Sequence, residues 1–253
     1  VLTIVLGLNE ADRNKRFLFF GMALTMLLGM AYSGTRTTNI ILPAGVALYG
    51  FITIQNKKTL VALFACVLLF LFVLFAPIYS NPTLNRIRTT FDSKEQSLNV
   101  REVNRHYIQP YLHYHPIGGG VSTTGSEGVM FYPSHPLAGF PPDSGLLKIG
   151  LEMGWVGLIL HLMLNAAILL QGIYFYFRMR NKELKMYLAA VLCSLFPFMV
   201  CQFSQNAIGQ IPSAIFFYSC MSLITRLKEF DAEGVNLESE KKEDKRPFLL
   251  LFK

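Results

Sequence analysis

Charged residues are scarce in this sequence. Asp, Glu, Lys and Arg make up 15% of the 253 residues, whereas 52% are hydrophobic. A soluble domain carries about 25% charged residues. The composition therefore excludes an ordinary soluble domain and favours a membrane protein.

Cysteine is also scarce, and its positions suggest no shared role. The four cysteines stand inside apolar runs and form no CxxC pair: Cys66, Cys193, Cys201 and Cys220. Cysteines of this kind behave as small buried hydrophobes. The sequence thus offers neither a disulfide framework nor a cysteine-based zinc site.

Several enzyme motifs are absent as well. The sequence contains no GxGxxG, no P-loop, no GxSxG and no HExxH. These absences remove sequence support for nucleotide binding, serine hydrolysis and zinc proteolysis. Any energy that a reaction needs must arrive with the substrate.

Long hydrophobic runs are what the sequence does have. A hydrocarbon core of about 30 Å is crossed by roughly 20 apolar residues. We expect six spans, at residues 17–32, 39–54, 59–79, 146–177, 185–203 and 207–225. The span at 146–177 is longer than a crossing needs, so we expect it to tilt or to project its first turns beyond the membrane. Residues 1–8 read as the end of another span, so we expect the chain to be the C-terminal part of a longer protein.

The orientation of these spans follows from lysine and arginine, which favour short cytoplasmic loops. Placing the polar segment 81–145 outside leaves Arg36 as the single basic residue in the outer short loops. The formal charge of +7 is then a signal of topology and of contact with membrane lipids, and it does not indicate nucleic-acid binding. We expect transmembrane helices at 1–80, one extracytoplasmic loop at 81–145, transmembrane helices at 146–225 and a charged cytoplasmic tail at 226–253.

Three arginines are candidates for binding an anion on the outer side. Arg36 ends the segment Ser33-Gly34-Thr35-Arg36, whose hydroxyls favour a phosphate site, although contact with lipid headgroups is an alternative. Arg101 and Arg105 are four residues apart and share one face of a helix, where two guanidinium groups could clamp a diphosphate. The alternative for this pair is a solvated helix face.

Histidine and acidic residues supply candidates for proton transfer. His113, His115 and His135 could hold a metal ion only in an extended arrangement, and packing within the loop is the commoner role, so we assign no metal. Asp143 precedes the span at 146–177, where it could cap the helix or act as a general base. Glu152 stands one turn after Lys148, which predicts an ion pair.

Two further patterns predict contacts between helices. Gly150 and Gly154 are spaced for close packing, and His161 and Asn165 are four residues apart inside an apolar run, where polar side chains form interhelical hydrogen bonds.

Taken together, three segments resemble the O-antigen ligase and polysaccharide polymerase family of bacterial multi-pass membrane proteins. Ser33-Gly34-Thr35-Arg36 looks like the family's S-x-S-R segment. The stretch from Arg101 to Pro116-Ile117-Gly118-Gly119-Gly120 looks like its R-x(n)-P-x-G-x-G segment. Pro142-Asp143-Ser144-Gly145-Leu146 with Glu152-Met153-Gly154 is similar to its H-N-S-x-L followed by E-x-G-x-x-G-L. One departure is that Pro142 stands where the ligases have histidine, which favours a polymerase or another branch.

The resemblance implies an all-α transmembrane bundle of the GT-C glycosyltransferase type in the bacterial cytoplasmic (inner) membrane. It implies transfer of a glycan from an undecaprenyl-diphosphate-linked donor to a glycan or lipid acceptor, in the assembly of surface polysaccharide such as lipopolysaccharide. Arg36, Arg101 and Arg105 would bind the diphosphate without a metal or other cofactor, and Asp143 or His135 would replace the missing base. The alternative functions are a lipid-glycan or anion transporter and a non-catalytic scaffold.

Overall fold

The computed structural model describes residues 1–10, 12–32, 38–54, 61 and 96–244. Every regular element among them is a helix, so the predicted all-α class is confirmed there. The helices are α1 (Leu2–Asn9), α2 (Arg13–Tyr32), α3 (Thr38–Ile52), α6 (Gln96–Tyr114), α7 (Gly125–Phe131), α8 (Gly145–Arg178), α9 (Lys182–Cys201) and α10 (Ser213–Asp244).

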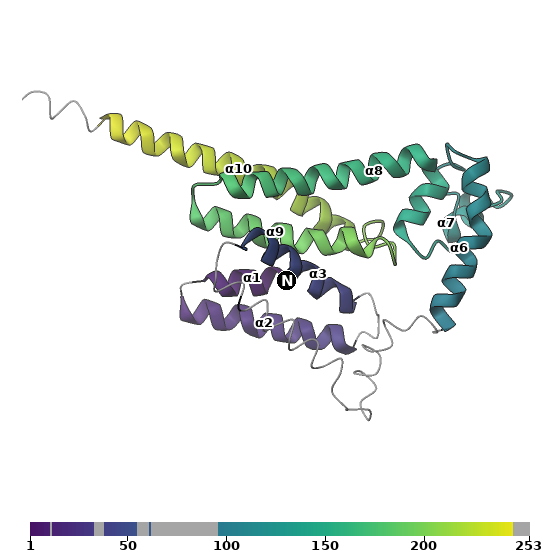
Figure 1. The fold of residues 1–253 in the computed structure, drawn as a ribbon, viewed down its shortest axis with the longest axis horizontal. Coiled ribbons are helices and arrows are strands. Elements are labelled where there is room, and N and C mark those ends of the chain that lie inside the picture. The colour runs from purple at the N-terminus through teal and green to yellow at the C-terminus, as the bar shows by residue number, and fades with distance from the viewer. Residues whose placement is uncertain (11, 33–37, 55–60, 62–95, 245–253) are drawn as a thin grey trace, which may run out of the picture.

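Helix α9 forms the centre of a bundle with α1, α2, α3, α8 and α10 (Figure 1). Its residues from Leu188 to Leu195 are all buried. A helix that is apolar on every face is stable only when neighbours cover it on several sides. Accordingly, α1, α3, α8 and α10 all contact α9.

Within the described part of the chain, α8 and α9 are long and apolar enough to cross a membrane. The two differ in what covers them. Most of the apolar stretch of α9 is buried by other helices, whereas α8 leaves side chains such as Leu160, Leu164 and Leu170 exposed. An exposed apolar face of this size suits lipid as its neighbour. Apart from residue 61, the predicted span at 59–79 lies outside the described residues.

Helix α10 differs at both ends from the predicted span at 207–225. It begins at Ser213, because Pro212 lacks a backbone N–H and disfavours helical geometry in the residue before it. It then runs to Asp244, through much of the charged tail that we expected at 226–253.

The described part of the polar segment begins at residue 96 and contains α6 and α7. Helices α6 and α7 lie across one end of the bundle, whereas the C-terminal half of α10 projects from the opposite end (Figure 1). The turn between α8 and α9, flanked by Arg178 and Lys182, lies at that opposite end. The arrangement is compatible with the sidedness expected from the basic residues, which stays a prediction.

Helix α8 is broken at Gly154, whose φ of 68° and ψ of −166° are not helical. The loop before α7 fills the break. The N–H groups of Gly119 and Gly120 donate to the carbonyls of Leu151 and Glu152, at 2.8 and 2.9 Å, and the Trp155 N–H donates to the Pro116 carbonyl at 2.9 Å. The backbone groups that the break exposes are therefore paired with the loop.

Replacing Gly154 with alanine should destabilise the protein. A Cβ atom there would collide with the Pro116 carbonyl oxygen, and a positive φ strains any L side chain. We expect a loss of more than about 2 kcal/mol, measured as a lower Tm in detergent. Gly21→Ala is the matched control, since a Cβ there meets nothing within 4 Å. An equal Tm for both variants would contradict this account of the break.

At the other end of the bundle, Asp231 of α10 holds the turn between α8 and α9. Its buried carboxylate accepts the N–H groups of Arg180 and Asn181, at 3.1 and 2.9 Å, and pairs with Lys228 at 3.2 Å. Burial alone would raise the pKa of this carboxyl, but the Asn181 N–H, the Lys228 ammonium and the Arg180 N–H together lower the pKa from its ordinary value of 3.8.

Because the folded pKa is lowered, the charged Asp231 stabilises the fold above about pH 4, and this contribution is lost as the pH falls further. Asp231→Asn should therefore lower the Tm at pH 7, and the difference from wild type should shrink towards pH 3. Glu229→Gln is the control, because its pair with Arg226 is exposed and contributes little. A Tm difference that is constant over this pH range would refute the assignment.

Candidate active site

Helix α6 is held against the first turns of α8 by a small apolar cluster. Ile108, Leu137 and Leu151 are its buried members, and Tyr111 and Leu112 pack against them. The close approach predicted from Gly150 is present, since a Cβ there would lie 3.4 Å from Leu112. This packing fixes the position of the arginines that precede Ile108 in α6.

Arg105 reaches from α6 to the segment that follows α9. Its Nη2 donates to the Phe203 carbonyl at 3.1 Å, and its guanidinium carbon lies 4.8 Å from the centre of the Phe203 ring. Among the described residues this is the one hydrogen bond that the guanidinium makes, so most of its five N–H groups have no acceptor there. Arg101 lies one helical turn earlier in α6, but its side chain and the whole of Arg36 lie outside the described structure.

Ser144, and not Asp143, caps α8. The Ser144 hydroxyl oxygen accepts the Leu147 N–H at 3.3 Å, and the same hydroxyl donates to the Gln202 carbonyl at 3.0 Å. The expected capping role of Asp143 is wrong because this residue lies one position too early. The half-buried Asp143 makes no hydrogen bond or ion pair with any described residue.

The contacts of Arg105 and Ser144 with the segment after α9 fall on consecutive residues. Arg105 binds the Phe203 carbonyl, and Ser144 binds the Gln202 carbonyl. A cationic side chain and the Asp143–Ser144 turn are thereby brought to the same two-residue segment, although about 40 residues separate Arg105 from Asp143 in the chain. We call this set of residues, Arg105, Asp143, Ser144, Gln202 and Phe203, the polar junction.

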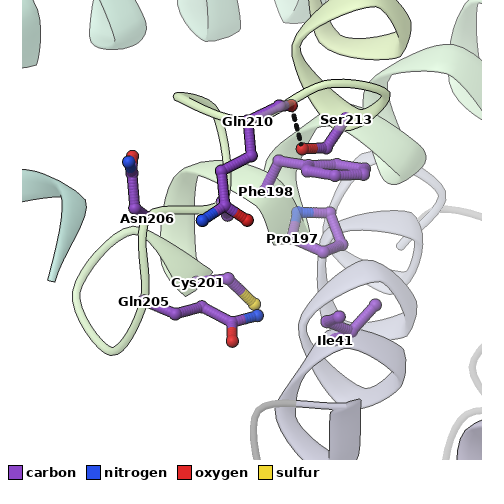
Figure 2. Close-up of a pocket in the computed structure, with 9 residues that line it drawn as sticks. Ile41, Pro197, Phe198, Cys201, Gln205, Asn206, Gln210 and Ser213 are labelled. Carbon is purple, nitrogen blue, oxygen red and sulfur yellow. Dashed lines mark hydrogen bonds between the residues drawn. The ribbon is translucent and has the colours of Figure 1, made fainter. Parts of the chain in front are cut away.

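A cavity of about 270 Å³ lies beside the polar junction. It is formed by the end of α9, the segment between α9 and α10, the start of α10 and one residue of α3 (Figure 2). The cavity and the polar junction adjoin each other. Gly145 directly follows Ser144, and a Cβ atom at Gly145 would lie 3.3 Å from Asn206, which lines the cavity. The α3 residue is Ile41, which follows Arg36 by five positions in the chain.

His135 lies close to Gly119. A Cβ at Gly119 would meet both the His135 ring and the Tyr111 hydroxyl, so these groups surround the loop that fills the α8 break. Burial raises the pKa of Tyr111. The Nδ1 atom of His135 accepts the Leu137 N–H at 3.2 Å. The neutral ring therefore carries its proton on Nε2.

His113 and His115, the other two histidines considered for a metal site, are exposed and lie beside aromatic rings. His115 stacks on Tyr111 with a centroid distance of 4.1 Å, and His113 lies 6.4 Å from the Trp155 ring. In the described residues, no group of three or more His, Cys, Asp or Glu side chains is arranged to hold a metal ion.

Glu152 connects α8 to the start of α7. Its buried carboxylate accepts hydrogen bonds from the hydroxyl and the N–H of Thr124. The predicted pair with Lys148 is present at 3.9 Å, but Lys148 lies closer to Glu127, at 2.8 Å. The hydrogen bond from Lys148 lowers the pKa of Glu127. Glu152 thus positions the segment between α6 and α8.

Sequence reasoning missed Gln202, which is 2% exposed. Its side-chain oxygen lies 2.8 Å from His161 Nε2, which also contacts Asn165 at 2.8 Å. The interhelical hydrogen bond expected from His161 is therefore made, and its partner is the residue whose carbonyl binds Ser144. An isolated glutamine in the apolar run Met199-Val200-Cys201-Gln202-Phe203 was the available signal.

This architecture, with exposed apolar helices and a polar site at one end of the bundle, is that of a helical membrane protein. The model of the O-antigen ligase family matches residues 21–162, more than half of the chain, and the chain belongs to this family. No curated protein and no solved structure matches it. Membership makes the chain an O-antigen ligase or polymerase-like membrane enzyme of polysaccharide assembly, of a kind that acts on lipid-linked glycans.

The capping assignment predicts different outcomes for neighbouring substitutions. Ser144→Ala removes the helix cap and the bond to Gln202, and should destabilise the protein by about 1–2 kcal/mol. Asp143→Ala removes no described contact and should leave the stability unchanged. Thermal unfolding of both purified variants tests this, and the reverse order of stabilities would show that Asp143 is the cap.

Proposed function

We propose that the protein transfers a glycan from an undecaprenyl-diphosphate-linked donor to an acceptor hydroxyl at the polar junction, on the outer face of the cytoplasmic membrane. The family membership supports the reaction class. The observation that carries the assignment to this place is that Arg105 and Ser144, the residue after Asp143, bind consecutive carbonyls beside a cavity.

The arginines stabilise the leaving group. As the bond between the anomeric carbon and the diphosphate oxygen breaks, its electron pair remains on that oxygen. Arg105, with Arg101 one turn away in α6 and Arg36 preceding α3, supplies charged N–H donors to the diphosphate. Guanidinium groups give this stabilisation without a metal ion.

Asp143 accepts the proton. The acceptor hydroxyl oxygen attacks the anomeric carbon, and its proton passes to the carboxylate. The absence of a described partner for Asp143 supports this role. His135 is the reserve candidate. Its Nδ1 is occupied by the Leu137 N–H, so the free Nε2 of the neutral ring already holds a proton, which favours Asp143.

Substitutions at the polar junction should abolish transfer without unfolding the protein. Arg105→Lys replaces a fork of donors with a point charge, and Asp143→Asn removes the base. We expect each variant to lose at least 100-fold in activity, in line with the roughly 10²–10⁴-fold that a general base contributes. Release of undecaprenyl diphosphate from the glycan donor, with purified protein in liposomes, measures the loss.

Arg178→Lys at the opposite end of the bundle is the matched control and should retain activity. His135→Gln separates the two candidate bases, because full activity of this variant leaves Asp143 as the acceptor. Near-normal transfer by both Arg105→Lys and Asp143→Asn would refute the proposal. Glycan profiles of a deletion strain then distinguish a polymerase, which sets chain length, from a ligase, which sets attachment.

A further inference from the structure

The cavity beside the polar junction has walls of two kinds. Ile41, Pro197 and Phe198 form an apolar wall, and the amide side chains of Gln205 and Gln210 lie across from it (Figure 2). The other lining residues are Cys201, Asn206, Ala207 and Ser213. None of these lining residues is charged.

Much of the hydrogen-bonding capacity of the amide wall is unused by the described chain. The side chains of Gln205 and Gln210 make no hydrogen bond to a described residue, and Asn206 uses its oxygen for the Gly209 N–H at 3.2 Å. A primary amide offers two donors and one acceptor. A ligand with several hydroxyl groups can form hydrogen bonds with each of these amide side chains.

The chemistry of the walls excludes two parts of a lipid-linked glycan. A diphosphate would find no cation among the lining residues. A polyisoprenoid chain would leave the amides without partners, and a polar group buried against hydrocarbon costs about 1–3 kcal/mol by mutational measures. The volume also lies just below the range of about 300–1,000 Å³ that ligand pockets occupy, which suits a small ligand.

We propose that this cavity binds one sugar residue of the glycan that reacts at the polar junction. A pyranose ring has an apolar face of C–H groups and an edge of hydroxyls, which match the Phe198 wall and the amide wall. The inference rests on the proposed function, because that function supplies a glycan next to Asn206. It adds a neutral sugar site distinct from the arginines that bind the diphosphate.

Binding measurements test the site without requiring catalysis. The probe is the repeat-unit oligosaccharide of the host cell, cleaved from its lipid carrier, titrated into the purified protein in nanodiscs. Gln205→Leu and Gln210→Leu should each weaken its affinity about tenfold, the effect of about 1.4 kcal/mol. Ala207→Phe, which fills the cavity, should abolish binding. Gln171→Leu, an exposed position of α8 outside the cavity, is the matched control and should bind normally.

A second titration uses undecaprenyl diphosphate without sugar, whose affinity should be unchanged in all four variants. Tighter binding of this lipid by the leucine variants would overturn the proposal in favour of an isoprenoid site. Wild-type oligosaccharide affinity in Gln205→Leu, Gln210→Leu and Ala207→Phe would also overturn it. The expected binding pattern in a protein that shows no transfer would instead keep the sugar site and refute the proposed reaction.

Discussion

The hydrogen bonds between the loop at 116–120 and the broken helix α8 are the contacts on which the rest of the site depends. In an unbroken helix, the carbonyls of Leu151 and Glu152 would accept N–H groups from the following turn. Here they accept the N–H groups of Gly119 and Gly120. The break and the loop therefore need each other, because either one alone would leave buried backbone groups without partners.

The segment that follows α9 connects α6, α8 and the cavity at this end of the bundle. Through consecutive carbonyls it binds α6 at Arg105 and the start of α8 at Ser144, and the Gln202 side chain reaches His161 further along α8. Its next residues line the cavity. The candidate chemical groups thus depend on a turn that carries none of the charged residues. A substitution in this turn would disturb the arginine, the carboxylate and the cavity at once.

Much of the fold could be predicted from the sequence, because it depends on composition and on the local spacing of residues. Apolar runs predicted the helical bundle, and the motif around Arg101 and Gly118 indicated the family. The break at Gly154 was not accessible, since its cause is a loop more than 30 residues earlier in the chain. The capping role expected of Asp143 was wrong, because Ser144 caps α8. Both residue types cap helices, and the hydrogen bond from the Leu147 N–H to the Ser144 hydroxyl decides between them.

The break at Gly154 also changes what the insertion machinery of the membrane must accept. The part of α8 after it, residues 155–178, would measure about 36 Å as a helix, enough for a hydrocarbon core of about 30 Å. Lys148 and Glu152 precede the break. Neither charge has to enter the bilayer, where insertion of a charged residue costs about 3 kcal/mol. What a hydropathy profile shows as one overlong segment is therefore a short helix that carries both charges, followed by an apolar helix long enough to cross a bilayer.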